Sequence, residues 1–147
     1  MENPMIERWY DLGVLPKEAR EMRIRVFCEE QGFTVEEEFD QLDASAYHIV
    51  LFDGDRPIAT GRMYQDEDGT MHIGRIAVEK ERRGTGTGRI LMEKLLARSL
   101  EIGTDRIVLS AQCRVIPFYK KMGFCTYGEP YMDGHVLHQS MYLTPGG

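Results

Sequence analysis

Residues 82–89 of this chain read Arg82-Arg83-Gly84-Thr85-Gly86-Thr87-Gly88-Arg89 and are rich in glycine and arginine. A β-branched, apolar segment, residues 73–78, leads into this stretch, and Ile90-Leu91-Met92 opens an apolar-periodic helix directly after it. At a junction of strand, glycine loop and helix, several backbone N–H groups converge on one small volume in front of the positive end of the helix dipole. Glycines carry no Cβ that would hold an anion away from the backbone. The sequence therefore predicts a site for a phosphorylated ligand.

Two common phosphate-binding motifs do not match this loop. A dinucleotide motif, G-x-G-x-x-G, that starts at Gly84 and Gly86 needs glycine at position 89, where the chain has Arg89. It also needs an acidic residue at the end of the next strand, which ends near Ser110 without one. A P-loop needs Gly-Lys-Ser/Thr, which the sequence lacks. The pattern that does match is Arg83-x-x-Gly86-x-Gly88, which is short and by itself unspecific.

Length and composition are those of one globular domain that spans residues 1–147. With 42% apolar and 29% charged residues, the chain can build a single hydrophobic core. It has no membrane-spanning apolar run and no signal-peptide pattern, so we expect a cytoplasmic protein without membrane contact. The three cysteines lack metal-ligand spacing, so we expect reduced thiols and no bound metal. A net charge of −6 argues against nucleic-acid binding.

Charge is unevenly distributed along the chain. Basic residues gather around the glycine loop, where they suit an anion: Lys80, Arg82, Arg83 and Arg89. Acidic residues gather further toward the N-terminus: Glu29, Glu30, Glu36, Glu37, Glu38, Asp40 and Asp43. The acidic group is either a solvated surface or the source of a field that attracts a cationic ligand.

Periodicity and turn residues predict an α/β protein, an α+β mixed sheet in the order β-α-β-β-β-α-β-α-β-β. The expected strands are residues 6–10, 47–52, 58–64, 71–78, 106–110, 124–131 and 136–142, and the expected helices are 17–30, 87–102 and 116–122. Residues 33–46 are expected to form a loop. The second to fourth strands should form an antiparallel meander, and the fourth and fifth should lie parallel through a right-handed crossover. The last strand is expected to be exposed, where it could mediate a homodimer.

This order resembles the fold of the GNAT N-acetyltransferase superfamily over nearly the whole chain. The loop Arg83-x-x-Gly86-x-Gly88 is similar to the pyrophosphate loop of that family. The segment Phe118-Tyr119-Lys120-Lys121-Met122-Gly123-Phe124 resembles its F-Y-x-K-x-G-F motif, in the expected place after the parallel strand. Gln112 and Val115 stand where the family usually has Asn and Ala, and Gln can still hydrogen-bond a carbonyl or a pantetheine amide.

Two further segments resemble the ElaA-like bacterial branch of the family. Arg25-Val26-Phe27-Cys28-Glu29-Glu30-Gln31-Gly32 is similar to its R-x-V-F-x-x-E-Q segment. The hairpin around Asp133-Gly134 is similar to its G-I-P-H-x-x-M hairpin and aligns His138 with the histidine there, although proline is absent at position 137. The resemblance implies a GNAT acyl-CoA N-acyltransferase fold and acetyl-CoA as cosubstrate. It also implies direct attack by a primary amine in a ternary complex, and it leaves the small-molecule or peptide acceptor open.

The resemblance also implies which residues bind the cosubstrate. Loop amides with the charges of Arg83 and Arg89 would hold the pyrophosphate, and a backbone N–H within residues 76–78 would polarise the thioester carbonyl. The expected set is Ile76, Ala77, Val78, Arg83, Gly84, Thr85, Gly86, Thr87, Gly88, Arg89, Gln112, Phe118 and Tyr119.

Proton transfer needs an acid and a base. Tyr119 is the candidate acid, because the resemblance places it at the sulfur, and a departing thiolate with a pKa of roughly 8.5 benefits from a donor. The alternative for Tyr119 is a packed core tyrosine. An alkyl amine with a pKa of about 10.4 must lose a proton before it attacks. Glu30, His138 and His72 are candidate bases, and a water relayed to solvent is a fourth.

Two other functions compete with the transferase. A non-catalytic acyl-CoA-binding sensor would keep the loop and lose the proton chemistry, whereas Tyr119 favours the enzyme. A dinucleotide-dependent oxidoreductase is disfavoured by Arg89. For the enzyme, the acidic group favours a cationic acceptor such as a polyamine, an amino sugar or a lysine side chain.

Overall fold

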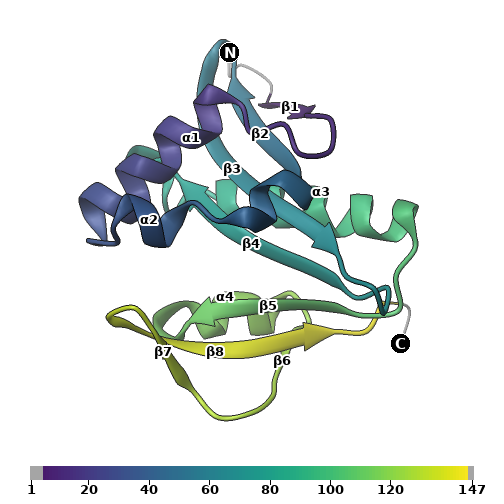
Figure 1. Cartoon of the computed structure of the whole chain (residues 1–147). Coiled ribbons are helices and arrows are strands. Elements are labelled where there is room, and N and C mark those ends of the chain that lie inside the picture. Colours follow the sequence, from purple (N-terminus) through teal and green to yellow (C-terminus); the bar gives the residue numbers. More distant parts are fainter. Residues whose placement is uncertain (1–4, 146–147) are drawn as a thin grey trace.

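The computed structural model describes residues 5–145 and contains one mixed sheet (Figure 1). The strands lie in the order β1-β2-β3-β4-β5-β8-β6, and β7 also pairs with β8. They are β1 (Met5–Trp9), β2 (Tyr47–Asp53), β3 (Arg56–Gln65), β4 (Met71–Val78), β5 (Ile107–Gln112), β6 (Cys125–Thr126), β7 (Tyr131–Asp133) and β8 (Val136–Leu143). The predicted order of elements is confirmed, as are the β2-β3-β4 meander and the parallel pairing of β4 with β5.

Helices cover both faces of the sheet. They are α1 (Lys17–Arg23), its π-type continuation η1 (Ile24–Glu30), α2 (Val35–Glu38), η2 (Gln41–Ser45), η3 (Lys80–Arg82), α3 (Thr87–Ile102), η4 (Cys113–Val115) and α4 (Ile116–Lys121). In Figure 1, α1 and α2 lie in front of β2–β4 and α3 lies behind them. Within residues 5–145, none of these helices combines the length and apolar character needed to cross a bilayer.

Strand alternation divides the core between these two helical layers. Ile49 and Leu51 of β2 belong to the large cluster that also holds Leu91 and Leu95 of α3. Val50, from the opposite face of the same strand, packs with Ala19 of α1. Successive side chains of a strand point to opposite faces, so β2 is buried on both sides and reads as a continuous apolar run.

Two predicted segments differ from the structure. Residues 33–46 do not form a loop, because Thr34 and Glu37 make a capping box that starts α2, and Asp40 caps η2. The strand predicted at 124–131 is wrong in extent, since only β6 and the start of β7 pair with β8. The final hairpin itself is confirmed, with Asp133 opposite Val136.

The prediction of an exposed last strand is wrong. One edge of β8 pairs with β5 over six residues, from Ile107↔Leu143 to Gln112↔His138. Its other edge pairs with β6 and β7. Within residues 5–145 both edges of β8 therefore have hydrogen-bonded partners.

Candidate functional site

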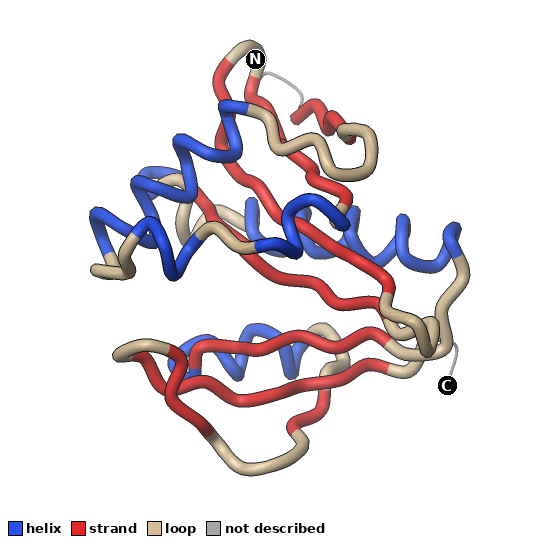
Figure 2. Tube along the Cα trace, viewed as in Figure 1, coloured by secondary structure: helices blue, strands red, loops and turns tan. Residues whose placement is uncertain are grey.

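The sheet opens between its two parallel strands. Among residues 5–145, β4 and β5 are joined only at Met71↔Ile107 and His72↔Val108, and beyond that point they diverge (Figure 2). A cavity of about 630 Å³ lies in the opening, with walls from η1, β4, the glycine loop, β5, α4 and β8. Past His72 the β5-facing edge of β4 has lost its ladder partner, so its backbone groups are available to a ligand.

The glycine loop forms one end of this cavity. Gly84 and Gly86 have φ of 78° and 88°, in the left-handed region, and Gly86 is the N-cap of α3. Among the residues that the structure describes, no side chain caps that helix end, and the first backbone N–H groups of a helix have no partner within it. A Cβ at Gly84 or Gly86 would have nothing within 4 Å, so the space before the helix is open. The uncapped N–H groups and the open space in front of them fit a pyrophosphate. The dipole of the 16-residue helix α3 adds positive charge at the same place.

The basic residues near the loop have different surroundings. Arg83 lines the cavity, where its Nε donates to the Val78 carbonyl at 3.1 Å and its Nη2 lies 2.7 Å from Glu30 Oε1. Arg89 also lines the cavity, and its exposed guanidinium pairs with Glu93 at 3.0 Å. Arg82 pairs instead with Asp53. Glu30 does not line the cavity, and its carboxylate contacts Arg83.

A β-bulge in β4 faces the same cavity. Arg62 pairs with Gly74 and Thr60 with Ala77, so Arg75 and Ile76 together lie opposite Gly61. A Cβ at Gly61 would lie 2.9 Å from Ile76 Cδ1, so glycine leaves room for the bulge. Arg75 has φ of 50°, a left-handed conformation that is uncommon for a residue other than glycine. Such bulges re-aim the backbone, here toward the side where β5 has separated.

Arg75 ties this bulge to a partly buried ionic network. Its Nε donates to the Glu38 carbonyl at 3.1 Å, and its Nη2 lies 3.2 Å from an Asp40 carboxylate oxygen. The network pairs three guanidinium groups with three carboxylates: Arg23, Arg62 and Arg75 with Glu38, Asp40 and Asp43. The expectation that the acidic residues act together as an anionic surface is therefore wrong for Glu38, Asp40 and Asp43, because arginines neutralise them.

Burial and ion pairing oppose each other within the network. Burial alone would raise the pKa of Asp43, but hydrogen bonds and charges from Arg23 and Arg62 outweigh it and lower that pKa to about 2. Burial dominates at Glu38, whose pKa is raised in spite of Arg75 and Arg23. The network joins α1, α2 and η2 to β3 and β4 and holds the N-terminal segment against the cavity.

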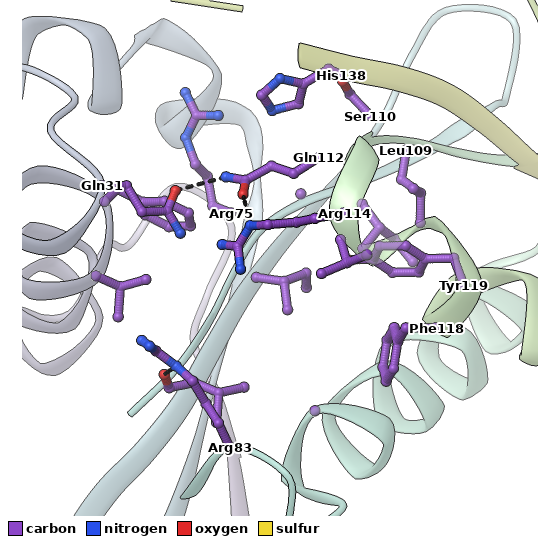
Figure 3. Close-up of a pocket in the computed structure, with 18 of the residues that line it drawn as sticks. Gln31, Arg75, Arg83, Leu109, Ser110, Gln112, Arg114, Phe118, Tyr119 and His138 are labelled. Atoms are coloured by element: carbon purple, nitrogen blue, oxygen red, sulfur yellow. Dashed lines mark hydrogen bonds between the residues drawn. The ribbon is translucent and has the colours of Figure 1, made fainter. Parts of the chain in front are cut away.

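Tyr119 of α4 lies in the wall of the cavity (Figure 3). It is 8% exposed, and its ring packs edge-on against Phe118 and Phe124 at centroid distances of 5.1 and 6.0 Å. Burial raises the pKa of its hydroxyl to about 12. The phenol therefore stays protonated at neutral pH and can donate a hydrogen bond.

His138 of β8 lines the cavity and is 6% exposed. Its Nδ1 lies 2.9 Å from the Val136 carbonyl oxygen. A carbonyl can only accept, so Nδ1 carries a proton and Nε2 of the neutral ring keeps a lone pair. His72, by contrast, does not line this cavity: its Nε2 is 2.9 Å from Asp66 Oδ2, and its ring stacks on Tyr64 at 4.6 Å.

A chain of polar side chains crosses the cavity. Gln112 donates to Gln31 Oε1 at 2.7 Å, and Arg114 donates to Gln112 Oε1 at 3.1 Å (Figure 3). Gln31 belongs to the segment 25–32 that resembles the R-x-V-F-x-x-E-Q motif. Its hydrogen bond with Gln112 was not predicted from the sequence. Arg75 and Arg114 were also missed. Their positions depend on a bulge and on the turn after β5, which leave no pattern in the sequence.

Most of the predicted cosubstrate residues come together around this cavity. Those that line it are Ile76, Val78, Arg83, Gly84, Gly86, Gly88, Arg89, Gln112, Phe118 and Tyr119. Ala77, Thr85 and Thr87 do not. Ala77 and Thr87 are buried in the packing beneath, and the Thr85 hydroxyl donates to the Arg82 carbonyl.

The architecture and loop agree with comparisons to known proteins. The model of the acetyltransferase (GNAT) family matches residues 9–124. The chain belongs to this family. A Bacillus subtilis protein named as the uncharacterized N-acetyltransferase YjcF is 36% identical over 126 residues, which are 85% of this chain and 89% of that protein.

Solved structures of GNAT proteins superpose over nearly the full length. ElaA of Escherichia coli has a TM-score of 0.84 and 25% identity, and the match covers 95% of this chain and 99% of that one. An acyl-CoA N-acyltransferase from Pseudomonas aeruginosa has a TM-score of 0.83 and 26% identity, with the same coverage. The resemblance to the ElaA-like branch is thus confirmed, as is the mixed-sheet GNAT fold.

Proposed function

We propose that this GNAT protein is an N-acetyltransferase that transfers an acetyl group from acetyl-CoA to a primary amine by direct attack in a ternary complex. One observation carries the proposal: a single cavity is lined by the glycine loop before α3 and also by Tyr119 and His138. A phosphate site and proton-transfer groups at the two ends of one cavity suit a long, phosphorylated acyl donor.

The loop and β4 would hold acetyl-CoA, which supplies the acyl group already activated as a thioester. The N–H groups at the start of α3, with Arg83 and Arg89, offer donors and positive charge to its pyrophosphate. The unpaired edge of β4 around Ile76 and Val78 offers backbone donors to the acyl carbonyl, where negative charge develops. Gln112 offers an amide for the pantetheine arm.

Tyr119 suits hydrogen-bond donation to the sulfur better than full proton transfer. Its pKa of about 12 lies about 3.5 units above that of an ordinary thiol at roughly 8.5. Moving its proton to the departing thiolate would therefore cost about 5 kcal/mol. Donating a hydrogen bond stabilises the developing charge without that cost.

We assign the base to His138, whose Nε2 lone pair is available within the cavity. Glu30 is already engaged by Arg83, and His72 by Asp66. The amine nitrogen bonds to the acyl carbon as the carbon–sulfur bond breaks. The amine proton passes to His138 and then to solvent, and CoA leaves as the thiol, protonated from solvent.

Calorimetric titration with CoA, acetyl-CoA and NAD, followed by a thiol-release assay over a panel of amines, tests the proposal. We expect CoA and acetyl-CoA to bind, NAD not to bind, and thiol release to depend on the amine. Acetyl-CoA binding without amine-dependent release would favour the non-catalytic sensor, and NAD binding would contradict the assigned ligand.

A further inference from the structure

A second, smaller cavity adjoins the first. It measures about 280 Å³ and shares part of its wall with the larger cavity, including Gly74, Arg75, Ser110 and His138. His138 therefore lies where the two spaces meet. If the larger cavity holds the acyl donor, an amine that enters through the smaller one reaches the thioester past the imidazole. We call this smaller cavity the acceptor slot.

Aromatic rings form much of the acceptor slot. Tyr64 of β3, stacked on His72 of β4, belongs to one part of the sheet, whereas Tyr127 and Tyr131 come from the segment that pairs with β8. The Tyr131 hydroxyl hydrogen-bonds Ser110, and its ring lies 6.1 Å from that of His138. These flat walls can enclose an apolar or aromatic side chain, with amphipathic rings that tolerate a polar edge.

Two arginines of the partly buried network also reach the acceptor slot. Arg62 and Arg75 both line it. Arg62 is 5% exposed, and its two terminal nitrogens donate to Asp40 and Asp43. Its Nε, however, has no hydrogen-bond partner within the part of the chain that the structure describes. A buried guanidinium N–H without an acceptor is costly, so an acceptor oxygen from a ligand or a water would stabilise this site.

Two different groups of charged residues line the acceptor slot. Arg62 and Arg75 belong to the network of three arginines and three carboxylates, so this part is neutral as a whole but presents donors. Asp133 lines both cavities and is exposed. A ligand that matches both features carries an anionic oxygen group for the arginines and an ammonium group for Asp133 and His138.

We infer that the acceptor is a free amino acid, whose carboxylate meets Arg62 and Arg75, whose amine faces His138, and whose side chain lies among the tyrosines. The inference rests on the proposed function and names its acceptor class. A slot of about 280 Å³ suits one amino-acid-sized molecule, being smaller than most sites for drug-sized ligands. An amino-acid acceptor replaces the expectation of a purely cationic acceptor. The products are an N-acetyl amino acid and CoA.

The test compares each α-amino acid with its carboxamide and with the amine that lacks the carboxylate. Thiol release from acetyl-CoA is followed with the wild-type protein. We expect kcat/KM at least tenfold higher for the preferred free acid than for its carboxamide. The carboxamide has the less basic amine and hence the larger unprotonated fraction at neutral pH, so amine basicity works against the expected preference.

Variants locate the carboxylate contact. Arg75→Gln should raise KM for the free acid and bring its preference over the carboxamide below threefold, and Arg75→Lys should restore part of that preference. Arg56→Gln is the matched control, because Arg56 is an ion-paired arginine that lines neither cavity, and it should keep the preference. CoA titration of each variant reports separately on the donor site.

The outcomes separate this inference from the proposed function. Equal wild-type kcat/KM for acid, carboxamide and decarboxylated amine would overturn the amino-acid acceptor and leave acetyl transfer standing. In that case a water satisfies Arg62. Absence of CoA binding, or of thiol release with every amine, would overturn the proposed function and this inference with it.

Discussion

The glycine loop of the larger cavity, which we call the donor end, and the acceptor slot, which we call the acceptor end, are built in different ways. At the donor end, residues 83–89 supply a contiguous stretch of backbone, with two glycines in the left-handed region and an uncapped helix start. At the acceptor end, side chains from β3, β4, β5, β7 and β8 converge, and a partly buried ionic network supports them. A site made of backbone depends on a few local conformations. A site made of side chains depends on the packing of every element that contributes one.

Gly86→Glu should have the largest effect, because it disrupts the donor end at its backbone. The substitution places a β-carbon at φ of 88° and a negative charge where the pyrophosphate is expected. Strain of about 1–2 kcal/mol and charge repulsion together should weaken CoA binding about a thousandfold, measured by calorimetry. Gly69→Glu is the matched control, with φ of 83° in the turn between β3 and β4. A folded Gly86→Glu protein with unchanged affinity would place the phosphate elsewhere.

Tyr119→Phe tests the hydrogen-bond donor that we propose for the sulfur of acetyl-CoA. The ring and its packing against Phe118 and Phe124 remain, and only the donor is lost. We expect kcat to fall by roughly ten- to a thousandfold with little change in CoA affinity. Because burial raises the pKa of Tyr119 to about 12, the wild-type rate should show no loss from ionisation of Tyr119 below pH 10.

Tyr142→Phe is a suitable control for that variant, since the Tyr142 ring packs against Tyr127 and lines neither cavity. Wild-type turnover in Tyr119→Phe would reduce Tyr119 to a packing residue.

Acid unfolding examines the network that supports the acceptor end. Asp43 has its pKa lowered from 3.8 to about 2 in the folded protein, so it stabilises the fold at pH values above about 4. That contribution, about 2 kcal/mol, is lost as the pH falls from about 4 to 2. Urea unfolding of the wild type and of Asp43→Asn should show a stability difference that shrinks over this range.

Asp55→Asn, at an exposed turn position, provides the comparison for that experiment. A difference between wild type and Asp43→Asn that stays constant from pH 6 to 2 would mean that Asp43 does not titrate in the way its ion pairs require.

His138→Gln should have the smallest effect, and that effect should depend on pH. Without the imidazole, the amine must lose its proton to solvent, so kcat/KM should fall about tenfold at neutral pH. The deficit should narrow toward pH 10, where a larger fraction of the acceptor amine is already unprotonated. A deficit that is the same at every pH would assign His138 to positioning the acceptor and leave the base to water.

The elements that the sequence predicted well are those with strong local signals. Helix α3 and strands β2, β3 and β4 appear within a few residues of their predicted bounds, because their apolar periodicity and glycine turns act locally. Helix α2 was missed because four residues show no period, although the Thr34–Glu37 capping box was present in the sequence. The exposure of β8 was misjudged because strand pairing joins distant residues.

The donor end could be predicted from local sequence alone. A strand, a glycine-rich turn and a helix start lie within residues 73–90, and backbone conformation and the helix dipole follow from neighbouring residues. The acceptor end depends on how distant elements pack together. The bulge at Arg75, the ion pairs that neutralise Glu38, Asp40 and Asp43, and the convergence of Arg62, Tyr131 and His138 arise from contacts between different elements of the fold. Such contacts depend on how the sheet is assembled and leave no periodic signal along the chain.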